Sequence, residues 1–92
     1  MSVAAEKTEE VTKLGKAKID ILTTKRKISK AFSELGGVTY DSIKAGKTDE
    51  LLEADDVKAL ITQLKELEAE LDIREETFDE LKNQKSDEES EE

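Results

Sequence analysis

Neighbouring carboxylates are the side chains of this 92-residue sequence that come closest to a catalytic arrangement. They form three groups in the second half of the chain: Asp55 and Asp56; Glu66, Glu68 and Glu70; Glu75 and Glu76. Two carboxylates can act as general acid and general base when a pocket drives their pKa values apart. A rod of two helices, which the surrounding pattern predicts, offers no obvious pocket. We therefore interpret the acidic groups as solvent-facing helix surface.

The segment 85–92, KSDEESEE, is a second place where oxygen ligands gather. Hard cations such as Ca²⁺ prefer oxygen ligands, but the segment lacks the glycine turn and the ligand spacing of an EF-hand. The chain also has no His and no Cys, and these residues are frequent metal ligands, bases and nucleophiles. The sequence predicts no catalytic, cofactor-binding or metal-ligating residue, no cofactor and no enzymatic activity.

A basic cluster in the first half could bind phosphate or an anionic membrane surface. It consists of Lys25, Arg26, Lys27 and Lys30. Pairing within the molecule is the alternative, because residues 1–47 carry ten Lys or Arg and six Asp or Glu, whereas residues 48–92 carry five and eighteen. The net charge of −9 argues against nucleic acid as a partner. It also favours internal pairing over membrane binding.

Helices must position these side chains, since apolar residues recur at spacings of three and four. We predict one helix over about residues 6–45 and another over about residues 49–84, with Thr48 or Asp49 as the N-cap of the second. In the first helix, one heptad position holds Leu14, Ile21, Ile28 and Leu35, and the other holds Val11, Lys18, Lys25 and Phe32. In the second helix, one position holds Val57, Leu64, Leu71 and Phe78, and the other holds Leu60, Leu67, Arg74 and Leu81.

Two places could reverse the chain, the pair Gly36-Gly37 and the single Gly46. A turn at the pair would leave a connection of about ten residues, which is long for a link between packed helices. A turn at Gly46 gives mostly apolar layers, for example Ile28 with Leu64. We therefore expect Gly46 to end the first helix. The helix then runs through the glycine pair at a cost of about 1 kcal/mol per glycine.

The same register brings the basic first helix against the acidic second helix. It places Lys25 near Glu68 and Lys18 near Glu75, and such pairs help to fix orientation. It also places two cations, Lys18 and Arg74, in one layer of the seam. We expect their long side chains to reach outward to solvent.

We assign the fold class as all-α, an antiparallel two-helix coiled-coil hairpin over residues 1–84 with a disordered acidic tail over residues 85–92. A lone hairpin has little core, and apolar residues beside the seam indicate dimerisation into a four-helix bundle. These residues are Ile19, Leu22, Ile61 and Ile73. No apolar run reaches the length of a membrane span and the N-terminus lacks a signal-peptide pattern, so we expect a cytoplasmic protein.

Residues 14–75 resemble the helical N-terminal part of small bacterial proteins that end in a zinc ribbon. The resemblance rests on Phe32, Leu35, Gly36 and Tyr40, followed by a second helix rich in Leu, Ile, Glu and Lys. The chain has no Cys, so the zinc ribbon is absent and its metal role is not carried over. The resemblance implies a bacterial helical architecture rather than an activity.

Together these patterns predict a non-enzymatic structural or protein–protein interaction module. Its partner is a second copy, another protein or both, and the helix faces form the binding surface. The alternative is a peripheral binder of an anionic membrane or other anionic surface, acting through the basic first helix.

Overall fold

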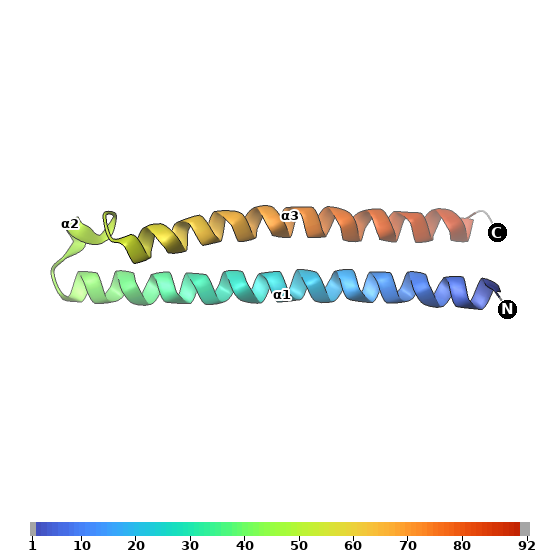
Figure 1. Ribbon diagram of the computed structural model, residues 1–92, viewed down its shortest axis with the longest axis horizontal. Coiled ribbons are helices and arrows are strands. Elements are labelled where there is room, and N and C mark those ends of the chain that lie inside the picture. The colour runs from blue at the N-terminus through green and yellow to red at the C-terminus, as the bar shows by residue number, and fades with distance from the viewer. Residues whose placement is uncertain (1, 91–92) are drawn as a thin grey trace.

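The computed structural model describes the backbone of residues 2–90 and the side chains of residues 12–84. Two long helices, α1 (Ser2–Lys44) and α3 (Asp55–Ser90), are joined through the short helix α2 (Thr48–Leu51). Figure 1 shows α1 and α3 side by side in opposite directions, with the start of α1 and the end of α3 at the same end of the molecule. The molecule measures 67 × 16 × 16 Å. Its length is that of α1, because 43 residues span about 65 Å at 1.5 Å per residue.

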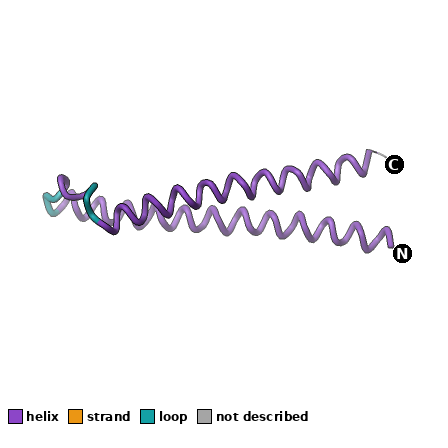
Figure 2. Tube along the Cα trace, turned by 45° about the horizontal axis from the view of Figure 1, so that its top comes forward, coloured by secondary structure: helices purple, strands orange, loops and turns teal. Residues whose placement is uncertain are grey.

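The buried core lies mainly in the half of the molecule nearer the chain reversal, and Ile21 lies near the middle of α1. The apolar members of the core, each less than a tenth exposed, are Ile21, Ala31, Val57, Leu60, Leu64 and Leu67. Toward the other end the seam residues, such as Leu14, Phe78 and Leu81, are only half-buried. Figure 2 shows the two helices drawing apart in that direction. The packing therefore weakens from the chain reversal toward the termini.

Gly46 ends α1, as predicted. Its φ of 73° lies in the left-handed region that only glycine adopts at little cost. The Gly46 amide donates to the Ile43 carbonyl at 3.1 Å, and the Lys47 amide donates to the Ser42 carbonyl at 2.8 Å. This bond pattern is the Schellman motif, which satisfies the last carbonyls of a helix.

The second long helix begins later than predicted. The structure places α2 over Thr48–Leu51, a turn after it, and the start of α3 at Asp55. The prediction of Thr48 or Asp49 as N-cap is wrong, because Lys47 precedes α2 and makes no side-chain cap bond. The first turn of α3 holds Asp55 and Asp56, where negative charge is favourable against the positive end of the helix dipole. Two adjacent acids at this point favour a new helix start over continuation from α2.

Gly36 and Gly37 lie inside α1 (Figure 1), as the register predicted. A Cβ built on either glycine would meet no atom within 4 Å. The pair therefore serves neither as a turn nor as a close crossing point between the helices. Tyr40 and Ile43 belong to the last turns of the helix, as expected.

The predicted seam of the second helix is confirmed. Every member of both heptad positions is buried or half-buried, from Val57 to Leu81. Two to three such residues per heptad make a narrow apolar stripe of the kind that packs one helix against one other.

The predicted seam of the first helix is half right. The set that begins with Leu14 is buried or half-buried, but Lys18, Lys25 and Phe32 are exposed, and the Val11 side chain lies outside the described residues. The second heptad position belongs instead to Ala17, Thr24, Ala31 and Val38. Burying a lysine costs its hydration, whereas these residues are uncharged and small. The helix therefore turns its small side chains, and not Phe32, toward α3.

This change also moves the register. Arg74 meets Asp20, not Lys18, and Phe78 meets Lys18, not Leu14. The facing residues of α1 thus lie about three positions later than predicted. Among the described side chains, the expected ion pairs of Lys18 with Glu75 and of Lys25 with Glu68 are not formed.

At its C-terminal end α3 extends to Ser90, beyond the predicted end at residue 84. The backbone of residues 85–90 is helical in the structure, where a disordered tail was predicted; residues 91 and 92 lie outside the described part. The segment 85–90 contains no apolar residue, so its sequence offers nothing to extend the seam.

Replacing each of the two candidate core residues, Ala31 and Phe32, by leucine tests the α1 seam. Ala31 is 2% exposed and packs with Leu60 and Leu64, whereas Phe32 is 51% exposed. We expect Ala31→Leu to lower the free energy of unfolding by about 1–3 kcal/mol through overpacking. Phe32→Leu should change it by less than about 0.5 kcal/mol at concentrations where the chain is monomeric. Urea unfolding measures both, and the reverse order would contradict this seam.

The glycines provide a second test, with a built-in control. We expect Gly36→Ala and Gly37→Ala each to raise the free energy of unfolding by about 0.5–1 kcal/mol, with a gain in helicity by circular dichroism. Gly46→Ala should lower it by about 1–2 kcal/mol, because the left-handed backbone strains any residue with a Cβ. Destabilisation by the Gly36 and Gly37 variants would mean that α1 is interrupted there.

Candidate functional site

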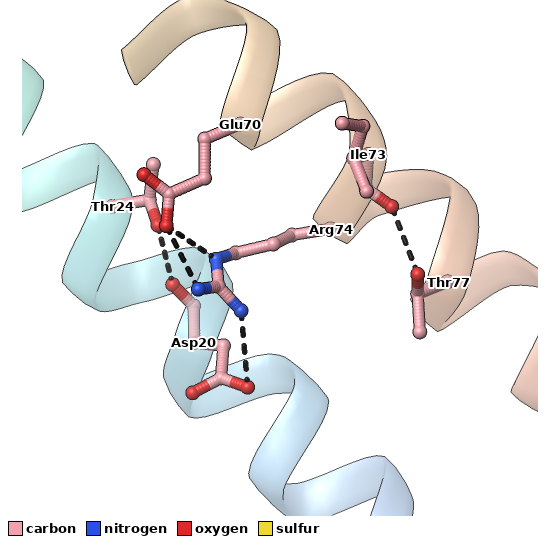
Figure 3. Close-up of polar contacts among 6 residues, drawn as sticks. All are labelled: Asp20, Thr24, Glu70, Ile73, Arg74 and Thr77. Atoms are coloured by element: carbon pink, nitrogen blue, oxygen red, sulfur yellow. Dashed lines mark hydrogen bonds and ion pairs between the residues drawn. The ribbon is translucent and has the colours of Figure 1, made fainter. Parts of the chain in front are cut away.

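One polar layer crosses the seam, and Arg74 is at its centre. Figure 3 shows the guanidinium of Arg74, on α3, reaching between a carboxylate of its own helix and one of α1. Its Nη1 lies 3.3 Å from Asp20 Oδ2. Its Nε and Nη2 donate to Glu70 Oε1 at 3.0 and 2.8 Å. A single cation therefore links two carboxylates from the two long helices.

Heptad spacing explains why these residues meet. Glu70 and Arg74 are four residues apart, so they share one side of α3. Asp20 precedes the seam residue Ile21 and so lies at the flank of the seam, while Thr24 occupies the next seam position. The Thr24 hydroxyl donates to the Asp20 carbonyl at 2.9 Å. That bond satisfies a side chain which is only 2% exposed, so the layer leaves no polar group of Thr24 unpaired.

The Arg74 layer contributes more to alignment than to stability. The three charged side chains are each 37–38% exposed, and ion pairs of that exposure are worth about 0–1 kcal/mol. Sliding one helix by a turn would separate Arg74 from Asp20 and bring the guanidinium against apolar seam residues. The layer therefore favours one register over its neighbours, which is a common role of polar residues in helix seams.

The predicted Lys18–Arg74 layer does not form. Lys18 lies outside the seam, with its Nζ 5.7 Å from the centroid of the Phe78 ring, a cation–π distance. The Lys18 ammonium group thus lies over the ring of the half-buried Phe78 at the weakly packed end of the molecule. The pairing of Asp20 with Arg74 could be read from the sequence only by assigning Thr24, and not Lys25, to the seam.

The predicted acidic groups remain apart from any such arrangement, with one exception. Glu66, Glu68, Glu75 and Glu76 are exposed, and only Glu70 enters the Arg74 layer. Within the described residues, no group of three or more acidic, His or Cys side chains is placed to hold a metal ion. The carboxylate groups therefore act here as helix surface and as partners for one arginine.

Three of the four residues of the predicted basic cluster lie on one side of α1. Lys25, Arg26, Lys27 and Lys30 are all exposed. Arg26 and Lys30 are four residues apart, and Lys27 and Lys30 are three apart, so these three share the outer side of α1, whereas Lys25 lies beside the seam. Only part of the cluster can contact a flat surface at one time.

The second feature is a face of exposed apolar side chains. We label the seam residues as heptad positions a and d, where a is the set that begins with Leu14 in α1 and with Val57 in α3. One side of the helix pair is then formed by positions b and e, with position f at its margin. We call this side the Phe32 face. Four of the eight large apolar side chains that the described residues expose lie on it, namely Leu22, Phe32, Ile43 and Ile61, and Ile19 and Tyr40 lie at its margin, at position f. The other two are Leu52, before α3, and Ile73, on the opposite side.

No family model, curated protein or solved structure matches this chain. The resemblance to the helical part of zinc-ribbon proteins therefore stays an expectation. None of the helices described here combines the length and the apolar character required to cross a bilayer.

Replacing Arg74 by an apolar residue tests its role. We expect Arg74→Leu to leave the free energy of unfolding unchanged or to raise it by about 1–2 kcal/mol, because leucine completes an apolar seam. The salt dependence of unfolding should weaken at the same time, since the two ion pairs are gone. Denaturation at low and high salt measures both effects, with Lys30→Leu, at an exposed site outside the seam, as control. A loss above about 1 kcal/mol would show that the ion pairs stabilise more than leucine does.

Proposed function

We propose that the chain is an antiparallel coiled-coil hairpin that serves as a non-enzymatic protein–protein interaction module, and that it self-associates into a four-helix bundle. A cytoplasmic location and a bacterial origin belong to the same proposal. The Phe32 face is the observation that supports the self-association.

The balance between core and surface supports this proposal. Among the described residues, six apolar side chains are buried, while eight large apolar side chains are exposed. A two-helix core of this size supplies little stability by itself. Burying exposed apolar side chains contributes about 25 cal/mol per Å², so association would stabilise the helices as well as join the copies. Coupling of folding to association is therefore expected.

Binding to an anionic surface is the second candidate, because Lys25, Arg26, Lys27 and Lys30 are all exposed. The net charge of −9 makes this the weaker proposal. Co-sedimentation with anionic vesicles separates the two. Salt-sensitive binding to them, without binding to neutral vesicles, would favour the surface binder.

Sedimentation equilibrium from low to high micromolar concentration tests the self-associating module. We expect a dimer whose population rises with concentration, with the helical circular dichroism signal rising in parallel because association buries the Phe32 face. A chain that stays monomeric and fully helical at high micromolar concentration would contradict self-association.

A further inference from the structure

We infer that the second copy binds on the Phe32 face with both chain reversals at the same end of the dimer, so that α1 of each copy lies along α3 of the other. This inference rests on the proposed self-association and adds the face and the arrangement. In chemical terms, the occupant of the face is the acidic helix of a second copy.

The apolar side chains give the centre of this interface. Phe32 on α1 and Ile61 on α3 both follow a core residue directly, Ala31 and Leu60, which belong to one packed cluster. They therefore flank the same side of the seam at nearly the same level. Phe32 is 51% exposed and Ile61 is 36% exposed. Face-to-face docking brings two such pairs together into one apolar layer between four helices.

Charge on the α1 half of the face is entirely positive. Between residues 12 and 44, positions b, e and f of α1 contain Lys18, Lys25 and Arg26 and no Asp or Glu. The acids of that segment, Asp20 among them, all occupy position g on the other side. The α1 half of the face thus presents cations beside apolar side chains, which suits an acidic amphipathic helix as partner.

The α3 half of the same face carries an acidic stretch that can serve as this partner. At the level of the α1 cations, positions b and e of α3 hold only acids: Glu68, Asp72, Glu75 and Asp79. Two contacts show which part of α3 lies beside which part of α1: Asp20 with Arg74 and Lys18 with Phe78. Basic and acidic stretches thus lie side by side, at equal distance from the chain reversal.

Only one symmetric arrangement of two such faces matches opposite charges. A two-fold axis along the molecule leaves each residue's position along the long axis unchanged and sets α1 of one copy on α3 of the other. The cations of one copy therefore meet the acids of the other. A two-fold axis across the molecule sets α1 on α1 with the levels reversed, and because the α1 half of the face holds no acid between residues 12 and 44, its cations find no partner in that arrangement. The first arrangement also makes every pair of adjacent helices antiparallel. Both arrangements satisfy closed dimer symmetry, so charge decides between them.

A single spin label per chain distinguishes the two arrangements. The chain has no Cys, so Lys47→Cys in the connection between α1 and α2 gives one labelling site. We expect a label–label distance of about 20–30 Å in the dimer, because neighbouring helix axes lie about 10 Å apart and the label arms add to this. A label–label distance of about 45 Å or more, which an axis across the molecule at Phe32 gives because Lys47 lies 15 residues beyond it at about 1.5 Å per residue, overturns the inference but leaves self-association standing. A monomer in sedimentation overturns both.

Two matched charge reversals test the face. Lys25→Glu lies on the Phe32 face, and Lys30→Glu lies on the same helix but on another side; both side chains are exposed, and both variants change the net charge equally. We expect Lys25→Glu to raise the dimer Kd by about tenfold or more, since the change occurs twice per dimer. Lys30→Glu should raise it by less than about twofold. Equal effects of the two variants would mean that the interface is elsewhere.

Discussion

The contact between small side chains of α1 and the leucines of α3 is the interaction on which the structure depends. Ala31 packs with Leu60 and Leu64, and the backbone of a helix can approach its neighbour only where its side chains are small. Placing Ala31 in the seam also fixes the rotation of α1. That rotation sends Phe32 outward and brings Asp20 within reach of Arg74. The core, the polar layer and the exposed face are thus consequences of one choice of helix phase.

Within that seam, the Arg74 layer supplies what apolar packing lacks. Leucines and small residues pack acceptably in several registers, because neighbouring heptads are alike. Arg74 keeps Glu70 as a partner in every register, because both lie on α3, but it meets Asp20 in only one of them. The layer also fixes which stretch of α1 lies beside which stretch of α3. The charge pattern of the Phe32 face therefore depends on a contact in the middle of the seam.

The sequence was sufficient for the architecture but not for the phase of α1. The seam of α3 is readable because leucines mark both of its heptad positions from Leu60 to Leu71. In α1 the larger Phe32 competes with Ala31, and hydrophobicity alone selects the phenylalanine. The structure selects alanine because the Phe32 phase would bury Lys18 and Lys25 as well. The polar layer was missed for the same reason, and the break before Asp55 depends on local capping that periodicity does not report.

The fold depends on α1 meeting α3 through its small side chains. A methyl NOESY spectrum of the isotopically labelled chain, filtered for contacts within one copy, tests this claim most directly. The account predicts NOEs from the Ala31 methyl group to the methyl groups of Leu60 and Leu64. NOEs from the Phe32 ring to Leu60 within one copy, with none from Ala31, would contradict it.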